Sequence, residues 1–167
     1  MIDSPKYPFE IPLGRYAMNF GAFEWTLING IAMLVSLDPA RHENQKLPTA
    51  FGQRVDLFDK LVKERISDPP IVEAHTALIR QIKKMATTRN GLLHGPWFDM
   101  PGTDIDAQKS KLVEVPIRLG DLLKPNSARS VTPIDIHFAM VALSGVSKGL
   151  SAHIARIKEA LVLKPPP

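Results

Sequence analysis

The chain contains no cysteine, so disulfides, thiolate nucleophiles and zinc sites of the cysteine type are excluded. Aromatic residues are scarce, with 2 Trp and 2 Tyr among 167 residues. No HExxH motif occurs, and no pair of carboxylates stands at helical spacing with a histidine partner. The sequence therefore predicts neither a metal site nor a bound cofactor.

Long apolar runs are also missing. The longest, Ile28–Leu37, is interrupted by Asn29 and Ser36 and is too short to span a bilayer. The first residues, Met1–Pro5, lack the basic-then-apolar order of a signal peptide. We therefore expect a cytoplasmic protein without membrane contact. A length of 167 residues suits one domain, 1–167, with a core of its own.

The net charge of +4 is unevenly distributed along the chain. Residues 71–167 carry 13 basic and 8 acidic side chains, whereas residues 1–70 carry 8 basic and 9 acidic ones. A basic half mildly favours a polyanionic partner such as RNA. Most such excesses, however, are only solvated surface.

Apolar residues recur at helical spacing in four segments, which predicts helices at 14–36, 49–66, 71–93 and 133–161. Thr49 and Thr132 are the expected N-caps of the second and fourth helices. The tight connection Asp68–Pro70 makes the second and third helices antiparallel neighbours. The main apolar stripes are Phe20, Phe23, Leu27, Ile31 and Leu34; Val55, Phe58, Val62 and Ile66; and Ile136, Leu143, Leu150 and Ile157.

The segment 96–125 differs in character from the helices. Trp97–Met100 and Leu112–Leu119 have the aromatic and β-branched content of short strands, and turn residues lie between them. The predicted fold class is therefore mainly all-α. We expect an antiparallel four- to five-helix bundle with a β-hairpin insertion, 96–125, before the last helix. The seven-residue repeat of that helix suits packing in the bundle or across a dimer seam.

The sequence Arg89-Asn90-Gly91-Leu92-Leu93-His94 carries the chemistry that stands out most. Arg89 continues the apolar stripe of the third helix, where a charge is costly unless it is paired or used. His94 follows where Gly95 and Pro96 end the helix. An arginine can hold a phosphate and a histidine can move a proton, but a buried arginine salt bridge and a helix-capping histidine fit the same residues.

Glu24 makes the structural alternative concrete, since it lies inside the apolar stripe of the first helix. A core-facing acid and a core-facing base should pair, so we predict a contact between Glu24 and Arg89. Such a contact would serve the fold alone or orient the guanidinium toward a substrate.

Residues 89–94, at the end of a helix in a mainly helical chain, resemble the motif of the HEPN superfamily. Members carry an arginine, usually followed by a polar residue, and a histidine four to six residues after the arginine. The resemblance implies that Arg89 and His94 are catalytic, that Asn90 supports them, and that Glu24 matches an acidic residue of an early helix in some members. Gly91 inside the motif and the long segment before the last helix depart from the compact pattern.

The resemblance also implies a function. Many HEPN proteins are metal-independent endoribonucleases of toxin–antitoxin and defence systems, act as homodimers, and cleave RNA by attack of the 2′-hydroxyl. This chain would then have RNA as substrate and a cognate antitoxin as protein partner. Other members lack nuclease activity, so the alternative is a non-catalytic module for dimerisation or for binding RNA or protein.

Overall fold

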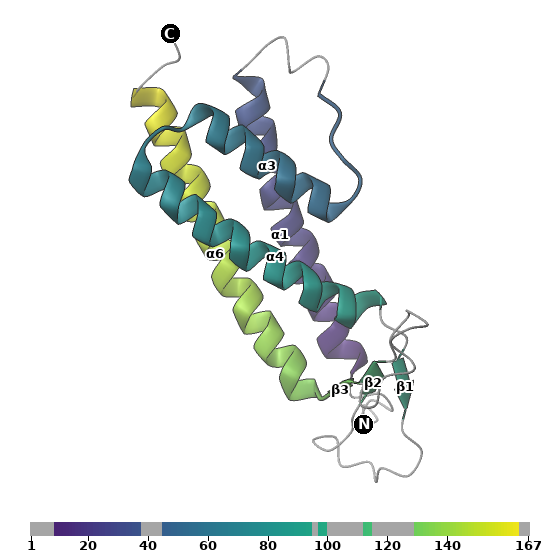
Figure 1. The fold of residues 1–167 in the computed structure, drawn as a ribbon. Helices are drawn as coiled ribbons and strands as arrows, with labels where there is room; N and C mark the ends of the chain where they lie inside the picture. The colour runs from purple at the N-terminus through teal and green to yellow at the C-terminus, as the bar shows by residue number, and fades with distance from the viewer. Residues whose placement is uncertain (1–8, 38–44, 95–96, 100–111, 115–128, 164–167) are drawn as a thin grey trace, which may run out of the picture. The chain divides into compact units, whose positions relative to one another are not determined.

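A computed structural model of the chain describes residues 9–37, 45–94, 97–99, 112–114 and 129–163. These residues form four helices and three short strands (Figure 1). The structure is therefore mainly helical, as predicted, and each helix differs from its predicted segment by only a few residues at the ends. The elements are α1 (Glu10–Ser36), α3 (Phe51–Arg65), α4 (Pro69–His94), β1 (Trp97–Asp99), β2 (Leu112–Glu114), β3 (Arg129–Val131) and α6 (Pro133–Leu163).

Prolines and caps set where the helices begin. The first turn of α4 contains Pro69 and Pro70, whose missing N–H groups would have no helical partner there, and the carbonyl of Asp68 accepts the N–H of Val72 at 3.0 Å. At α6 the carboxylate of Asp135 accepts the backbone N–H of Thr132 at 2.8 Å, and the Thr132 hydroxyl accepts the Asp135 N–H at 3.3 Å. The predicted cap at Thr132 is confirmed.

The predicted cap at Thr49 is wrong. Ala50 occupies the N-cap position of α3 and makes no side-chain capping bond. The carbonyl of Thr49 instead accepts a hydrogen bond of 2.9 Å from Arg54 Nη2. Arg54, one turn into α3, therefore holds the residue before the helix through its backbone carbonyl.

Contacts divide the chain into two units, and each is described by itself. The four-helix unit comprises Gly21–Ala86 and Leu143–Pro167. The Arg89 unit comprises Met1–Phe20 and Thr87–Ala142. The single domain expected from the length stays a prediction.

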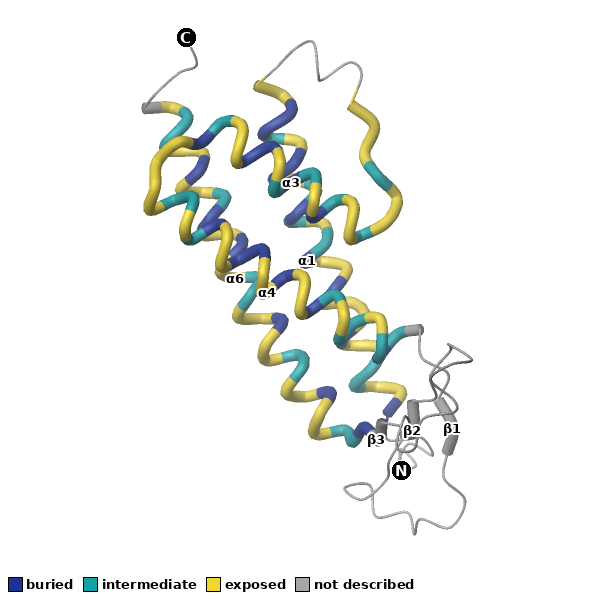
Figure 2. Tube along the Cα trace, in the orientation of Figure 1, coloured by how far each residue is buried: buried dark blue, intermediate teal, exposed yellow. Residues whose placement is uncertain are grey.

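The core of the four-helix unit consists of the predicted apolar stripes. Buried residues recur at helical spacing along each helix (Figure 2). The stripe of α6 continues the seven-residue repeat, with Leu143 1% exposed and Leu150 and Ile157 fully buried. The buried residues that α1, α3 and α4 contribute include Phe23, Leu27, Ile31, Leu34, Val55, Phe58, Leu61, Val62, Leu78, Ile79, Ile82 and Met85.

Contacts within this unit give the helix directions. On α3 and α4, Asp56 contacts Lys83 and Asp59 contacts His75, so these two helices are antiparallel, as predicted. On α1 and α3 the order is the same in both helices, because Phe23 contacts Phe51 and Gly30 lies against Phe58. The expectation of a wholly antiparallel bundle is therefore wrong for α1 and α3. α3 begins beside Phe23, at the middle of α1.

The Arg89 unit contains a small antiparallel sheet of three strands in the order β1-β2-β3. Trp97 lies opposite Glu114, and Leu112 lies opposite Val131. The structure thus does not describe the isolated two-stranded hairpin that was expected over 96–125, because a third strand precedes α6 directly. The predicted turn at 101–104 and the stretch 115–125 lie outside the described residues.

By length and composition alone, Pro133–Val162 of α6 is apolar enough to cross a membrane, a test that the core helix of a soluble protein also passes. The sequence expectation considered uninterrupted apolar runs and did not single out this segment.

Candidate functional site

Arg89 lies near the end of α4, one turn beyond the buried Met85, and is itself half-buried. Its Nη1 donates a hydrogen bond of 3.0 Å to the side-chain oxygen of Asn90. Its Cζ lies 5.3 Å from the ring centroid of Phe20 on α1, a cation–π distance. Among the described residues of its unit, Arg89 forms no ion pair with a carboxylate. The guanidinium is therefore oriented by an amide and a ring, and neither neutralises its charge.

Tyr16 adds a second polar group beside Phe20. Tyr16 is fully buried, and its ring centroid lies 6.3 Å from that of Phe20. Burial raises the pKa of its hydroxyl, and the positive charge of Arg89 opposes that rise. Among the described residues, the Tyr16 hydroxyl and Arg89 Nε are both buried and have no hydrogen-bond partner. No pattern in the sequence singles out Tyr16, because one tyrosine on a helix is most often a core residue.

Of the other two motif residues, the structure describes the side chain of Asn90 and not that of His94. Asn90 is exposed and holds Arg89 through its side-chain oxygen, the supporting position that the resemblance implies. His94 is the last residue of α4, and its side chain lies outside the described residues. The convergence of Arg89 and His94 stays a prediction.

Glu24 has a different partner from the one predicted. Its Oε1 lies 2.6 Å from Nη1 of Arg54 on α3, and both side chains are less than a quarter exposed. The same guanidinium donates to the carbonyls of Pro48 at 2.6 Å and Thr49 at 2.9 Å. Helical periodicity placed Glu24 on the correct face of α1. It could not tell which helix lies opposite.

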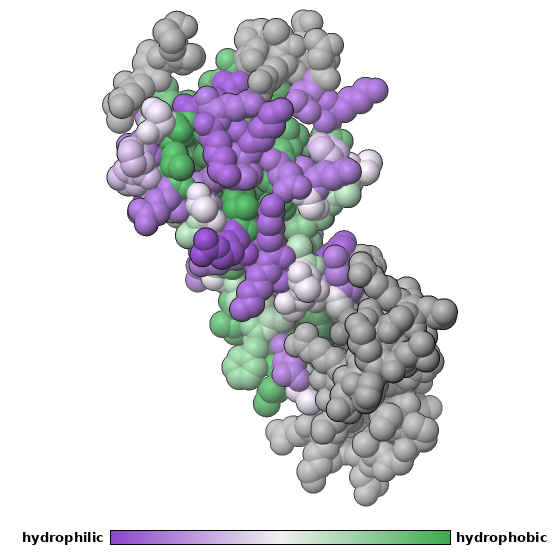
Figure 3. Space-filling model, viewed as in Figure 1, coloured by the Kyte–Doolittle hydropathy of each residue, from purple (hydrophilic) through white to green (hydrophobic). Residues whose placement is uncertain are grey.

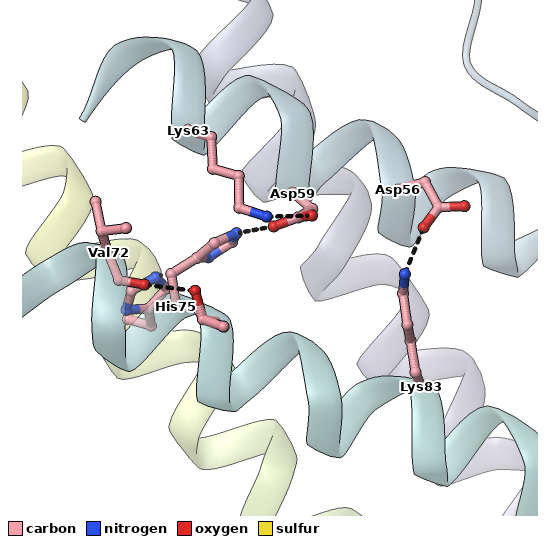
Figure 4. Close-up of polar contacts among 8 residues, drawn as sticks. Asp56, Asp59, Lys63, Val72, His75 and Lys83 are labelled. Atoms are coloured by element: carbon pink, nitrogen blue, oxygen red, sulfur yellow. Dashed lines mark hydrogen bonds and ion pairs between the residues drawn. The ribbon is translucent and has the colours of Figure 1, made fainter. Parts of the chain in front are cut away.

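The four-helix unit also buries a polar cluster that the sequence did not predict. His75 on α4 is fully buried and His153 on α6 is 5% exposed. His75 Nδ1 lies 3.1 Å from His153 Nε2. On its other side, His75 Nε2 lies 3.1 Å from a carboxylate oxygen of Asp59 (Figure 4). The two rings stack, with centroids 5.2 Å apart. We call Asp59, His75 and His153 the histidine cluster.

One protonation pattern satisfies the histidine cluster. His75 donates its Nε2–H to Asp59 and accepts the Nε2–H of His153 at Nδ1, with both rings neutral. Burial lowers the pKa of His75 against the opposing pull of Asp59. Burial, the neighbouring His75 and Arg156 lower the pKa of His153 to about 4. The signal in the sequence was slight: His153 stands between Leu150 and Ile157 on the buried stripe of α6.

The described surface of the four-helix unit carries further ion pairs, including one of 3.9 Å between Lys60 and Glu64. Lys63 lies 2.9 Å from the second carboxylate oxygen of Asp59, and Lys83 lies 2.8 Å from Asp56 (Figure 4). Figure 3 shows that hydrophilic residues cover much of the face that α3 and the first half of α4 present. Among the described residues, no group of three or more histidines and carboxylates is arranged to hold a metal ion.

Hydrophobic residues gather over the N-terminal part of α6, in the Arg89 unit (Figure 3). Ile134 is 63%, Phe138 66% and Val141 58% exposed. Their spacing places them on one face of the helix, away from the buried Ile136. We call these three residues the α6 apolar face.

Comparison of the chain with protein-family models, with curated proteins and with solved structures finds no match.

Proposed function

We propose that this chain is a HEPN-like, metal-independent endoribonuclease in which Arg89, Asn90 and His94 act on an RNA phosphodiester. His94 takes the proton of a ribose 2′-hydroxyl, and the 2′-oxygen attacks the adjacent phosphorus. The bond from phosphorus to the 5′-oxygen breaks, and that oxygen takes up a proton. Arg89 stabilises the negative charge that develops on the phosphate oxygens. The products are a 2′,3′-cyclic phosphate and a 5′-hydroxyl.

The observation that carries this proposal is the state of the Arg89 charge. A salt bridge would have explained an arginine in an apolar stripe without any function, and Glu24 was the expected partner. Glu24 is bound by Arg54 instead, and Arg89 is held by Asn90 and Phe20. Because a partly buried cation gains most from an anion, an oxyanion such as phosphate is the class of ligand that suits this site.

The proposal extends to partners. The α6 apolar face would be buried by a second copy of the chain, which would bring two copies of the motif together as the HEPN resemblance implies. A toxin or defence role in the cytoplasm, with a cognate antitoxin, belongs to the same proposal.

A second candidate function is a non-catalytic module for dimerisation or for binding RNA or protein. The α6 apolar face favours it, since exposed apolar residues on one helix face mark interaction surfaces in catalytic and non-catalytic proteins alike. In this reading Arg89 serves only to pack α4 against Phe20.

An RNase assay in the presence of EDTA separates the two candidates. The purified chain is incubated with a pool of labelled RNA of mixed sequence, and product ends are mapped for cyclic phosphate. We expect cleavage by the wild type, loss of at least a hundredfold in rate in His94→Ala, and an unchanged melting temperature. His137→Ala is the matched control, because His137 is an exposed histidine on α6. Absence of cleavage by the wild type on every RNA tested would support the binding module.

A further inference from the structure

We propose that the Tyr16 hydroxyl and the Arg89 guanidinium together form a phosphate-binding site, in which both donate hydrogen bonds to oxygens of one phosphate group. The inference rests on the proposed function for the identity of the phosphate, which would be that of an RNA phosphodiester. It adds to the site a residue that the motif does not contain.

The two groups meet at one aromatic ring. Tyr16 and Phe20 stand one helical turn apart on α1, with ring centroids 6.3 Å apart. The guanidinium of Arg89, on α4, lies over the Phe20 ring at 5.3 Å. Tyr16 is close enough to Arg89 that the positive charge acts on the ionisation of its hydroxyl. The phenol and the guanidinium therefore share one locality in the Arg89 unit.

Both groups are donors that find no acceptor in the part of the chain that the structure describes. Arg89 Nε carries one hydrogen and has no lone pair to accept with, and it is buried without a partner. The Tyr16 hydroxyl is also buried without a partner, so the two groups do not bond to each other. Buried donors are nearly always satisfied in folded proteins, so two orphans at one place require an explanation. A ligand with two or more acceptor oxygens provides it.

Charge selects the class of ligand. Arg89 brings a positive charge that no carboxylate of the described part of its unit neutralises, so the acceptor should be an anion. Burial raises the pKa of Tyr16, which keeps the phenol protonated at neutral pH and able to donate. A phosphate presents several oxygens to one guanidinium and one phenol at once. A single water molecule also accepts two hydrogen bonds, and it is the alternative that the experiment must exclude.

The test compares Tyr16→Phe with the wild type, since this change removes one oxygen and keeps the ring. Binding is measured with a fluorescein-labelled 2′-deoxy-substituted RNA 20-mer, which cannot be cleaved, and with inorganic phosphate against chloride at equal ionic strength. Thr26→Val is the matched control on α1, because the Thr26 hydroxyl already donates to the carbonyl of Ala22 at 3.1 Å.

We expect Tyr16→Phe to weaken binding of the oligonucleotide and of phosphate by roughly tenfold, the loss of one hydrogen bond to a charged acceptor. Its melting temperature should not fall, because the hydroxyl has no partner in the unliganded protein. Thr26→Val should bind as the wild type does. In a double-mutant cycle, Tyr16→Phe and Arg89→Lys should be non-additive, since both act on the same phosphate.

Two results would overturn the inference. One is unchanged affinity for both probes in Tyr16→Phe together with a lower melting temperature, which would mean that the hydroxyl holds a structural water. The other is a wild type that binds phosphate no better than chloride. If Tyr16→Phe does not fold, the deciding measurement is whether the effects of Arg89→Lys and of a phosphorothioate change in the probe are additive, and additivity refutes the shared site. Phosphate binding through Tyr16 without RNA cleavage would retain this inference and refute the nuclease function. RNA cleavage by the wild type, with unchanged affinity of Tyr16→Phe for both probes, would retain the nuclease function and refute this inference.

Discussion

Acidification should weaken the four-helix unit through the histidine cluster. His75 and His153 are buried as neutral rings that satisfy each other and Asp59. An added proton on His153 would place a charge in the core, where burial, His75 and Arg156 all disfavour it. The charged groups that act on His75 from α3 are Asp59, which favours its protonation, and Lys63, which opposes it. Burial outweighs Asp59, so both rings resist protonation in the fold.

The size of the effect follows from linkage. His153 has a pKa of about 4 in the fold and about 6.5 when solvated. The unfolded chain therefore binds more protons between these values, and stability is complete above pH 6.5 and declines as the pH falls toward 4. The whole shift corresponds to about 3 kcal/mol in the free energy of unfolding, and about 2 kcal/mol of it is lost by pH 5. The lowered pKa of His75 acts in the same direction.

Urea denaturation followed by circular dichroism between pH 4.5 and 7.5 measures this dependence. The informative variant is His153→Gln, because its amide can still donate to Nδ1 of His75 but cannot take up a proton. We expect the wild type to lose about 2 kcal/mol more than His153→Gln on going from pH 7.5 to pH 5. His137→Gln, at an exposed histidine of the same helix, should follow the wild type.

Equal pH dependence in the wild type and His153→Gln would refute the reasoning. It would mean that the buried ring titrates in the fold as it does in the unfolded chain. A larger loss in His153→Gln than in the wild type would refute it as well.

Two further predictions concern the packing of the four-helix unit. Arg54→Met should lower the free energy of unfolding by about 2–3 kcal/mol, because it leaves the half-buried Glu24 carboxylate without its partner. Lys83→Met, which removes an exposed ion pair, should change the free energy of unfolding by less than about 1 kcal/mol in the same chemical denaturation. Gly30→Val should destabilise the protein by about 1–3 kcal/mol, since even a Cβ there would lie 2.8 Å from Ile154 Cδ1. Gly21→Ala, with open space around the added Cβ, should stabilise it by about 0.5–1 kcal/mol. The melting temperatures of the two variants measure these effects, and equal shifts would contradict the packing argument.

The sequence predicts the helices well because their apolar periodicity records which side chains are removed from water. The repeat Ile136, Leu143, Leu150 and Ile157 is buried throughout. Periodicity does not record which helix lies opposite or in which direction it runs. The shared direction of α1 and α3 depends on the linker between them, and the pairing of Glu24 with Arg54 follows from that arrangement.

The candidate site is less predictable for the same reason. Residues 75 and 153 meet only because α4 and α6 pack antiparallel, and each histidine alone looks like an ordinary core or surface residue. Tyr16 is equally unremarkable until Arg89 is placed over the neighbouring ring. Local chemistry selected Arg89 and Asn90, whereas the groups that complete a site come from distant parts of the chain.

Arg54 and Arg89 both face apolar surroundings, but their guanidinium groups have different partners. Arg54 has a carboxylate and two carbonyls, so its charge and its donors are used by the fold. Arg89 has an amide and an aromatic ring, and its Nε donor is left buried and unused. If both served only stability, the second arrangement would be the costlier one, because it desolvates a cation without pairing it. A chain that retains such an arrangement gains stability when an anion binds, so phosphate should raise the melting temperature of the wild type and not that of Arg89→Lys with Tyr16→Phe.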